Sequence, residues 1–183
     1  MRDINVLEKV RQKLVANAAN IFRMPVKLMP TAIQNMTLLE GLKLVFKEAL
    51  EDGDFEFLEG KWLKVSVNDM DLSWFISCDN GKLLVSTEQV EHHVSFSGSL
   101  NDLVLIAGRK EDPDTLFFQR RLSIEGDTEL GLEVKNLMDS VDLDALPKTV
   151  KMGLDQLSTF VSKGVQTSSD SYSSSVRETE NAY

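Results

Sequence analysis

The strongest constraint on the fold is a central block in which apolar and polar residues alternate. Residues 63–67 read LKVSV, the period-two pattern of a strand with one buried face. The pattern recurs at residues 72–77, breaks at the Asp-Asn-Gly turn of residues 79–81 and resumes at residues 83–85. Two such runs around an Asn-Gly turn predict a β-hairpin. Shorter runs at residues 94–96 and 122–124 predict further strands.

Helical periodicity appears on both sides of this block. Thr31 and Gln34 form a capping-box pattern that predicts the start of one helix, and Gly53 marks its end. After the strands, Asp127 precedes apolar residues at three- and four-residue spacing, which predicts another capped helix. A final helix is expected after Pro147. Strands in the middle and helices at both ends predict an α+β fold with one mainly antiparallel sheet.

The N-terminal segment, residues 1–28, differs in charge from the rest of the chain. It holds six Lys or Arg against two acidic residues, whereas the whole chain carries a net charge of −9. Apolar side chains recur at helical spacing through residues 4–22, so we expect a basic amphipathic helix. Pro25 and Pro30 are expected to end it.

A helix of this kind suits contact with an anionic membrane surface. Its apolar stripe can enter the interface, and its basic residues are attracted to acidic lipids. The residues expected to make the contact are Leu7, Lys9, Val10, Lys13 and Leu14. The alternative is that the helix packs on its own sheet or on a partner protein.

The opposite end of the chain, residues 165–183, is rich in Ser and Thr and nearly free of large aliphatic side chains. Such a segment buries too little apolar surface to offset the entropy of ordering it. We therefore expect a disordered tail at residues 165–183, after a folded domain at residues 29–164.

Charge and composition exclude several classes of protein. The net charge of −9 argues against a nucleic-acid partner. No apolar run approaches the roughly 18 residues of a spanning helix. Asp3 and Glu8 argue against a secretory signal. The single Cys78 cannot form an internal disulfide, so we expect a reducing, cytoplasmic setting.

Side chains capable of catalysis or metal binding are few. His92 and His93 are adjacent, so on a strand they face opposite sides and cannot easily share a metal. Cys78 has an acidic neighbour rather than the basic one that a reactive thiolate needs, so we expect an unreactive thiol. The carboxylates of residues 112–129 are explained as helix caps and turn residues. We expect no catalytic group, metal or cofactor; a hydrolase or transferase built on those carboxylates is the alternative.

The apolar content of the domain permits two interpretations. The chain has nine Phe, two Trp and seven Met, which suit either a solid core or a cavity lined for a long apolar ligand. Composition alone leaves both interpretations open.

Three stretches of sequence resemble a known family. Residues 112–141, DPDTLFFQRRLSIEGDTELGLEVKNLMDSV, resemble the hallmark region of the sterol carrier protein type 2 family, which consists of a strand, a Gly-Asp turn and a helix. A narrower resemblance, to the branch of that family that serves bacterial ubiquinone biosynthesis without oxygen, is carried by residues 22–30, FRMPVKLMP, residues 55–75, FEFLEGKWLKVSVNDMDLSWF, and residues 112–132, DPDTLFFQRRLSIEGDTELGL.

The resemblance implies a five-stranded sheet covered by helices around an apolar lipid tunnel, without catalytic machinery. It also implies a non-enzymatic accessory factor that binds prenylated ubiquinone intermediates or phospholipid. Such a factor would present its ligand to a pair of peptidase-like iron–sulfur hydroxylases, in the cytoplasm and peripherally on the inner membrane. From the apolar faces, the expected lining residues are Phe46, Trp74, Ile76, Leu103, Phe117, Leu132, Leu137 and Met138. The alternative is an acidic scaffold that recruits biosynthetic enzymes, with lipid binding incidental.

Overall fold

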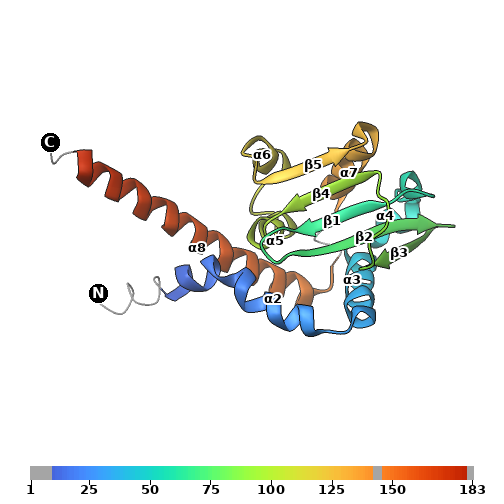
Figure 1. Cartoon of the computed structure of the whole chain (residues 1–183), viewed down its shortest axis with the longest axis horizontal. Coiled ribbons are helices and arrows are strands. Elements are labelled where there is room, and N and C mark those ends of the chain that lie inside the picture. The colour runs from blue at the N-terminus through green and yellow to red at the C-terminus, as the bar shows by residue number, and fades with distance from the viewer. Residues whose placement is uncertain (1–9, 142–145, 181–183) are drawn as a thin grey trace.

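One five-stranded sheet with helices packed on it forms the body of the molecule (Figure 1). The computed structural model describes residues 10–141 and 146–180, with side chains up to residue 165. The strands are β1 Leu63–Val67, β2 Leu72–Asp79, β3 Lys82–Ser86, β4 Val94–Gly98 and β5 Leu122–Gly126.

The strand order is β3-β2-β1-β4-β5. The β1–β4 pair is parallel and the other three pairs are antiparallel, which confirms the prediction of an α+β fold with a mainly antiparallel sheet. At the β2–β3 hairpin, Asn80 and Gly81 have φ angles of 51° and 72°. Two consecutive positive φ values give a turn whose twist matches that of the flanking strands, and Asn-Gly adopts it at little cost.

Helices flank the sheet in sequence and cover it in space. Their bounds are α2 Ala18–Leu28, α3 Thr31–Val45, α4 Lys47–Asp52, α5 Leu100–Ala107, α6 Pro113–Phe118, α7 Thr128–Ser140 and α8 Lys148–Glu180, with a short 3₁₀ turn at Glu56–Leu58. Residues 10–16 are also helical. The helix α7 packs on β4 and β5, α3 packs on β3, and α8 packs on α5.

Three helices begin at a capping side chain, and the cap at Asp127 is one that the sequence predicts. The Asp127 carboxylate accepts hydrogen bonds from the backbone N–H groups of Glu129 and Leu130, at 2.9 and 3.1 Å. Asp112 accepts from Thr115 in the same way at the start of α6, and Ser99 caps α5. These bonds satisfy backbone donors that a helix N-terminus otherwise leaves unpaired.

The predicted capping box at Thr31 is wrong. The residue that precedes α3 is Pro30, and no side chain caps the helix. Instead, Gln34 Nε2 donates to the carbonyl oxygens of Val26 and Met29, at 3.0 and 2.8 Å. Gln34 therefore adds side-chain hydrogen bonds to two carbonyls at the end of α2 and holds the corner between α2 and α3.

The prediction that Pro25 ends the N-terminal helix is wrong. Pro25 lies inside α2, which continues to Leu28. The missing N–H of Pro25 removes one backbone bond, and the helix closes one turn later, before Pro30, so the disruption is confined to that last turn.

The helix α8 extends to Glu180, into the segment for which composition predicts disorder. No Gly or Pro follows Gly164 in the sequence, so nothing there interrupts the backbone bonds of the helix. Scarcity of apolar side chains removes tertiary contacts but leaves these local bonds available. At the start of this segment Val165 packs against the smaller apolar cluster described below. The disordered tail at residues 165–183 stays a prediction.

Two apolar clusters hold the molecule together. The larger lies between the sheet and its covering helices and includes Leu58, Ile76, Cys78 and Leu130. The smaller consists of Val15, Leu105 and Val161, with Val104 and Val165 packed against them. It attaches the N-terminal helical segment and α8 to α5.

The Asp127 cap generates a stability prediction. Replacement of Asp127 by Ala removes both hydrogen bonds, so we expect the free energy of unfolding in urea to fall by about 1 kcal/mol. Asp127→Asn keeps an acceptor and should change it much less. Equal losses for the two variants would show that the carboxylate charge, and not its capping geometry, matters at this position.

Candidate functional site

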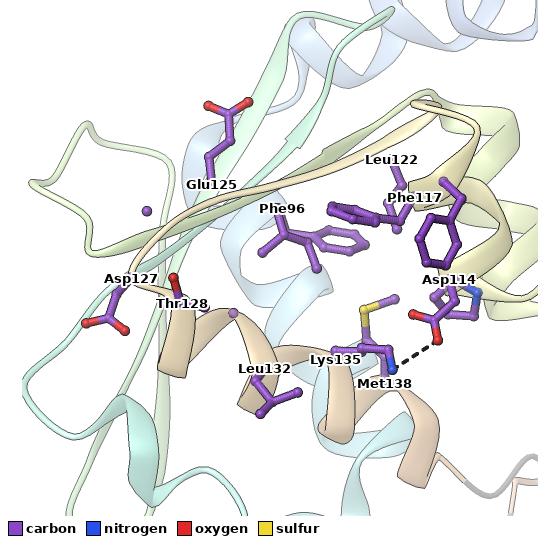
Figure 2. Close-up of a pocket in the computed structure, with 15 residues that line it drawn as sticks. Phe96, Asp114, Phe117, Leu122, Glu125, Asp127, Thr128, Leu132, Lys135 and Met138 are labelled. Atoms are coloured by element: carbon purple, nitrogen blue, oxygen red, sulfur yellow. Dashed lines mark ion pairs between the residues drawn. The ribbon is translucent and has the colours of Figure 1, made fainter.

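Two apolar cavities lie next to each other under the helices that cover the sheet. The first, which we call the α6 cavity, has a volume of about 460 Å³ and lies between β5, α6 and α7 (Figure 2). The second, the α5 cavity, has a volume of about 250 Å³ and lies between the central strands, α3, α5 and α7. Phe96 and Met138 line both cavities.

The register of the strands explains why the cavities adjoin. Ile124 of β5 pairs with Phe96 of β4, and Phe96 pairs with Val65 of β1. Paired residues point to the same face of a sheet, so these three apolar side chains form one row across it. Ile124 lines the α6 cavity, Val65 lines the α5 cavity, and Phe96 lies between them.

The opposite wall is α7, whose successive turns face different cavities. Gly131 and Lys135 line the α6 cavity, whereas Val134 and Leu137 line the α5 cavity. A Cβ atom on Gly131 would lie 3.0 Å from Ile124 Cγ2, so the missing side chain lets the helix approach β5 closely. Helix periodicity places Met138 at the boundary of the two faces.

The structure places seven of the eight expected lining residues at these cavities. Phe117 and Leu132 line the α6 cavity, Met138 lines both, and the others line the α5 cavity: Phe46, Ile76, Leu103 and Leu137. Trp74 is at neither cavity. It pairs with Val65, and its indole Nε1 is buried without a hydrogen-bond partner among the described residues.

Sequence reasoning missed Phe96, Val65 and Ile124 as lining residues. The signal was present in the alternation of the strands, because these residues occupy the positions that face the core. Strand alternation gives the face of a side chain, but not which strands will be neighbours, and β1 pairs with a strand distant from it in sequence.

Exposed apolar side chains surround the mouth of the α6 cavity. Phe117 is 45% exposed, Phe118 82% and Leu132 56%; we call these three residues the apolar rim. The two aromatic rings contact each other edge to face, with centroids 6.1 Å apart. Clustered exposed apolar groups beside a cavity are typical of a binding surface.

Charged groups lie at the edges of the cavities. Lys135 Nζ is 3.1 Å from Asp114 Oδ2, an ion pair that joins α7 to α6 (Figure 2). The hydrogen bond to Asp114 raises the pKa of Lys135, so this lysine stays protonated. Among the described residues that line the α5 cavity, Arg109 alone is charged. Its guanidinium donates to the carbonyl oxygens of Asp139 and Val141 at the end of α7.

Potential catalytic side chains have structural partners instead. His93 Nδ1 accepts a hydrogen bond from the Trp62 backbone N–H at 3.2 Å, and the ring of the exposed His92 lies 5.9 Å from that of Phe75. In the described part of the chain, no three His, Cys, Asp or Glu side chains come close enough to hold a metal. The α6 cavity is lined by Asp114, Glu125, Asp127 and Lys135 in addition to its apolar side chains, and the α5 cavity is almost entirely apolar.

The residues expected to contact a membrane are only partly described. Leu7 and Lys9 lie outside the described residues, whereas Val10, Lys13 and Leu14 are exposed. No residue of α2 is buried, and its exposed apolar side chains are Ile21, Phe22, Met24 and Leu28. None of the described helices combines the length and the apolar character that a bilayer crossing requires.

Two basic residues of α2 are held by one carboxylate. Asp71, in the turn between β1 and β2, lies 2.7 Å from Lys27 and 3.2 Å from Arg23. The hydrogen bond from Lys27 and the charges of both basic residues lower the pKa of Asp71. Asp71 therefore stays ionised at neutral pH and fixes α2 to the sheet.

Comparison with known proteins gives a consistent set of relatives. The sequence pattern of the SCP-2 sterol transfer family matches residues 39–139. "Ubiquinone biosynthesis accessory factor UbiT" of Escherichia coli (strain K12) is 50% identical over 173 residues, which cover 94% of this chain and 99% of that protein. The same protein from strain O157:H7 matches equally well.

Two solved structures are similar in part. "UbiJ-SCP2 Ubiquinone synthesis protein" has a TM-score of 0.49 and 16% identity, and covers 59% of this chain and 95% of its own. The sterol carrier protein domain 2 of Helicoverpa armigera has a TM-score of 0.43 and 26% identity, and covers 55% and 84%. Family membership rests on the sequence matches and not on these structures.

Cys78 provides a test of the unreactive thiol. Burial raises the pKa of the Cys78 thiol, and the nearby Glu59 carboxylate adds to the shift. We expect the thiol to react with a disulfide reagent at neutral pH far more slowly than in urea-unfolded protein, because both access and thiolate are reduced. Since the folded state retains the proton longer, stability should fall as the pH rises above the ordinary thiol pKa of about 9. Fast labelling of the native protein would contradict this.

Proposed function

Because this chain belongs to the SCP-2 sterol transfer family, we propose that it is a non-enzymatic, lipid-binding accessory factor of ubiquinone biosynthesis. The observation that carries the proposal is the pair of adjoining apolar cavities, one of which has an exposed apolar rim. The 50% identity to an accessory factor of that pathway supports the same conclusion.

The physical task of such a factor follows from the chemistry of a prenyl chain. Burial of each CH₂ group is worth about 0.8 kcal/mol, so a single five-carbon unit costs several kcal/mol to expose to water. A chain of several units therefore does not travel free through solvent. An apolar cavity resembles the bilayer interior, so transfer between the two is nearly neutral, provided that water is excluded on the way.

We propose that the ligands are prenylated ubiquinone intermediates, with phospholipid as the competing ligand. The volume of the α6 cavity falls within the range of small-ligand sites, roughly 300–1,000 Å³. The proposed lining set consists of the residues expected from the sequence without Trp74. The α5 cavity extends the available apolar wall. Together they make up the tunnel in which we place the chain.

The finer assignment within the pathway rests on the sequence resemblance. On that basis we propose the oxygen-independent branch, with presentation of the ligand to a pair of peptidase-like iron–sulfur hydroxylases. The strongly acidic part of the chain after residue 30 offers a charged surface for protein partners. No group in the cavities is assigned to the hydroxylation itself.

We also propose that the protein works in the cytoplasm, peripherally on the inner membrane. The support is the exposed apolar surface of residues 10–16 and α2, which carries Val10, Leu14 and Phe22 beside Lys13. An apolar face flanked by basic residues binds acidic lipid surfaces reversibly. The α6 cavity and this surface are carried by different helices.

Lipid binding can be tested by filling the α5 cavity. Leu103→Trp places a larger side chain in this cavity, which displaces part of the ligand. If the ligand loses burial of only two of its methylene groups, its binding weakens by roughly tenfold. We therefore expect much less prenylquinone or phospholipid to co-purify with this variant, as measured by solvent extraction and mass spectrometry.

The matched control is Leu157→Trp, which makes the same change at an exposed position of α8 that lines neither cavity. It should retain wild-type amounts of lipid. Absence of any lipid from the wild-type protein would contradict the proposal.

An acidic scaffold is the second candidate function, favoured by the charge of the chain. The Leu103→Trp variant separates the two functions. If it loses lipid and still supports ubiquinone synthesis in cells, the scaffold explains the function. If ubiquinone synthesis fails while partner proteins still bind, lipid binding explains the function.

The membrane role is tested through Asp71. Replacement of Asp71 by Asn releases the charges of Arg23 and Lys27, so binding to vesicles that contain phosphatidylglycerol should strengthen several-fold in a sedimentation assay. The gain should disappear at high salt. Glu133→Gln removes one negative charge from the exposed face of α7 and serves as the control. An equal gain in this control would show that net charge alone is responsible.

A further inference from the structure

We infer that Met138 is a gate between the α6 cavity and the α5 cavity, and that it sets the length of prenyl chain that the protein holds. This inference rests on the proposed function. It differs from that proposal in assigning chain-length selection to one side chain.

The partition between the cavities consists of two side chains on opposite walls. Phe96 projects from β4 and Met138 from α7, and they are the two residues that line both cavities. In Figure 2 Met138 lies beside the Lys135–Asp114 ion pair, whereas Thr128 and Asp127 lie on the other side of the α6 cavity. A chain that extends from the α6 cavity into the α5 cavity therefore passes Phe96 and Met138.

Of the two side chains, Phe96 is the fixed one. It is 5% exposed and belongs to the main apolar cluster. Its backbone lies between two hydrogen-bonded strands, with Val65 and Ile124 beside it. Movement of its ring would disturb close packing on both sides, which protein interiors resist.

Met138 has the freedom that Phe96 lacks. Its side chain is unbranched, with three rotatable bonds, and adapts to irregular space at little cost. It is only partly buried and lies two residues before the end of α7. It also lines a third hollow of about 220 Å³, beside Ile106 and Pro113. Rotation toward that hollow would widen the passage beside Phe96.

The polarity of the two cavities gives the direction in which a ligand lies. The α6 cavity is lined by the Lys135–Asp114 ion pair and Thr128 as well as by apolar groups, and these suit a polar ring. The α5 cavity is walled by aliphatic side chains such as Leu42 and Val134. The head group therefore stays in the α6 cavity, and the tail continues past Met138. A short tail ends before Met138, whereas a long tail needs the gate open.

The test blocks the gate by Met138→Trp. The probes are para-hydroxybenzoates that carry geranyl, farnesyl or geranylgeranyl chains, and the readout is the amount retained by the protein after gel filtration. Retention of the geranylgeranyl compound relative to the geranyl compound should fall by roughly tenfold or more in the variant. Met152→Trp makes the same substitution at an exposed position of α8 and should change neither.

A second variant covers the case in which Met138→Trp does not fold. Met138→Ala removes the gate, so transfer of the geranylgeranyl compound to acceptor vesicles should become several-fold faster relative to transfer of the geranyl compound. An unchanged chain-length profile in the Trp variant, or an unchanged relative transfer of the long chain in the Ala variant, would overturn the gate. Failure of the wild-type protein to retain any of the three probes would instead overturn lipid binding itself.

Discussion

The packing of α7 against β4 and β5 is the contact on which the rest of the structure depends. It is set at one end by the Asp127 cap and farther along by Gly131, whose missing side chain lets the helix approach Ile124. Leu130 and Val134 are buried in this contact. The helix and the sheet are nevertheless not in contact along their whole length. The two cavities occupy the space left between them, and Met138 of α7 lines both.

The features that depend on local sequence could be predicted, and those that depend on distant neighbours could not. Alternation gave the five strands, and the caps at Asp112 and Asp127 are bonds within a few residues. The predicted capping box placed the Gln34 side chain at the start of its own helix. In the structure its amide instead donates to two carbonyls at the end of the preceding helix. The lining residues on α7 followed from its amphipathic faces, whereas Phe96 and Val65 required knowledge of which strands pair.

Polar side chains in this domain connect elements of its fold. The buried Asp102 pairs with Arg121 and accepts a bond from Ser99, which joins α5 to the start of β5. The buried carboxylate of Asp102 would be costly without a partner, so its burial favours the ion pair with Arg121. The Asp102–Arg121 pair therefore serves the frame of the domain, where it connects α5 to β5.

The small cluster of Val15, Leu105 and Val161 has a consequence for what counts as the unit of folding. Val15 approaches α8 so closely that a Cβ atom on Gly164 would lie 2.6 Å from Val15 Cγ2. The stretch that matches the family, residues 39–139, contains Leu105 but neither of its two partners. A chain cut to that stretch would expose Leu105 to water, so the stretch that defines the family is smaller than the packed body of this protein.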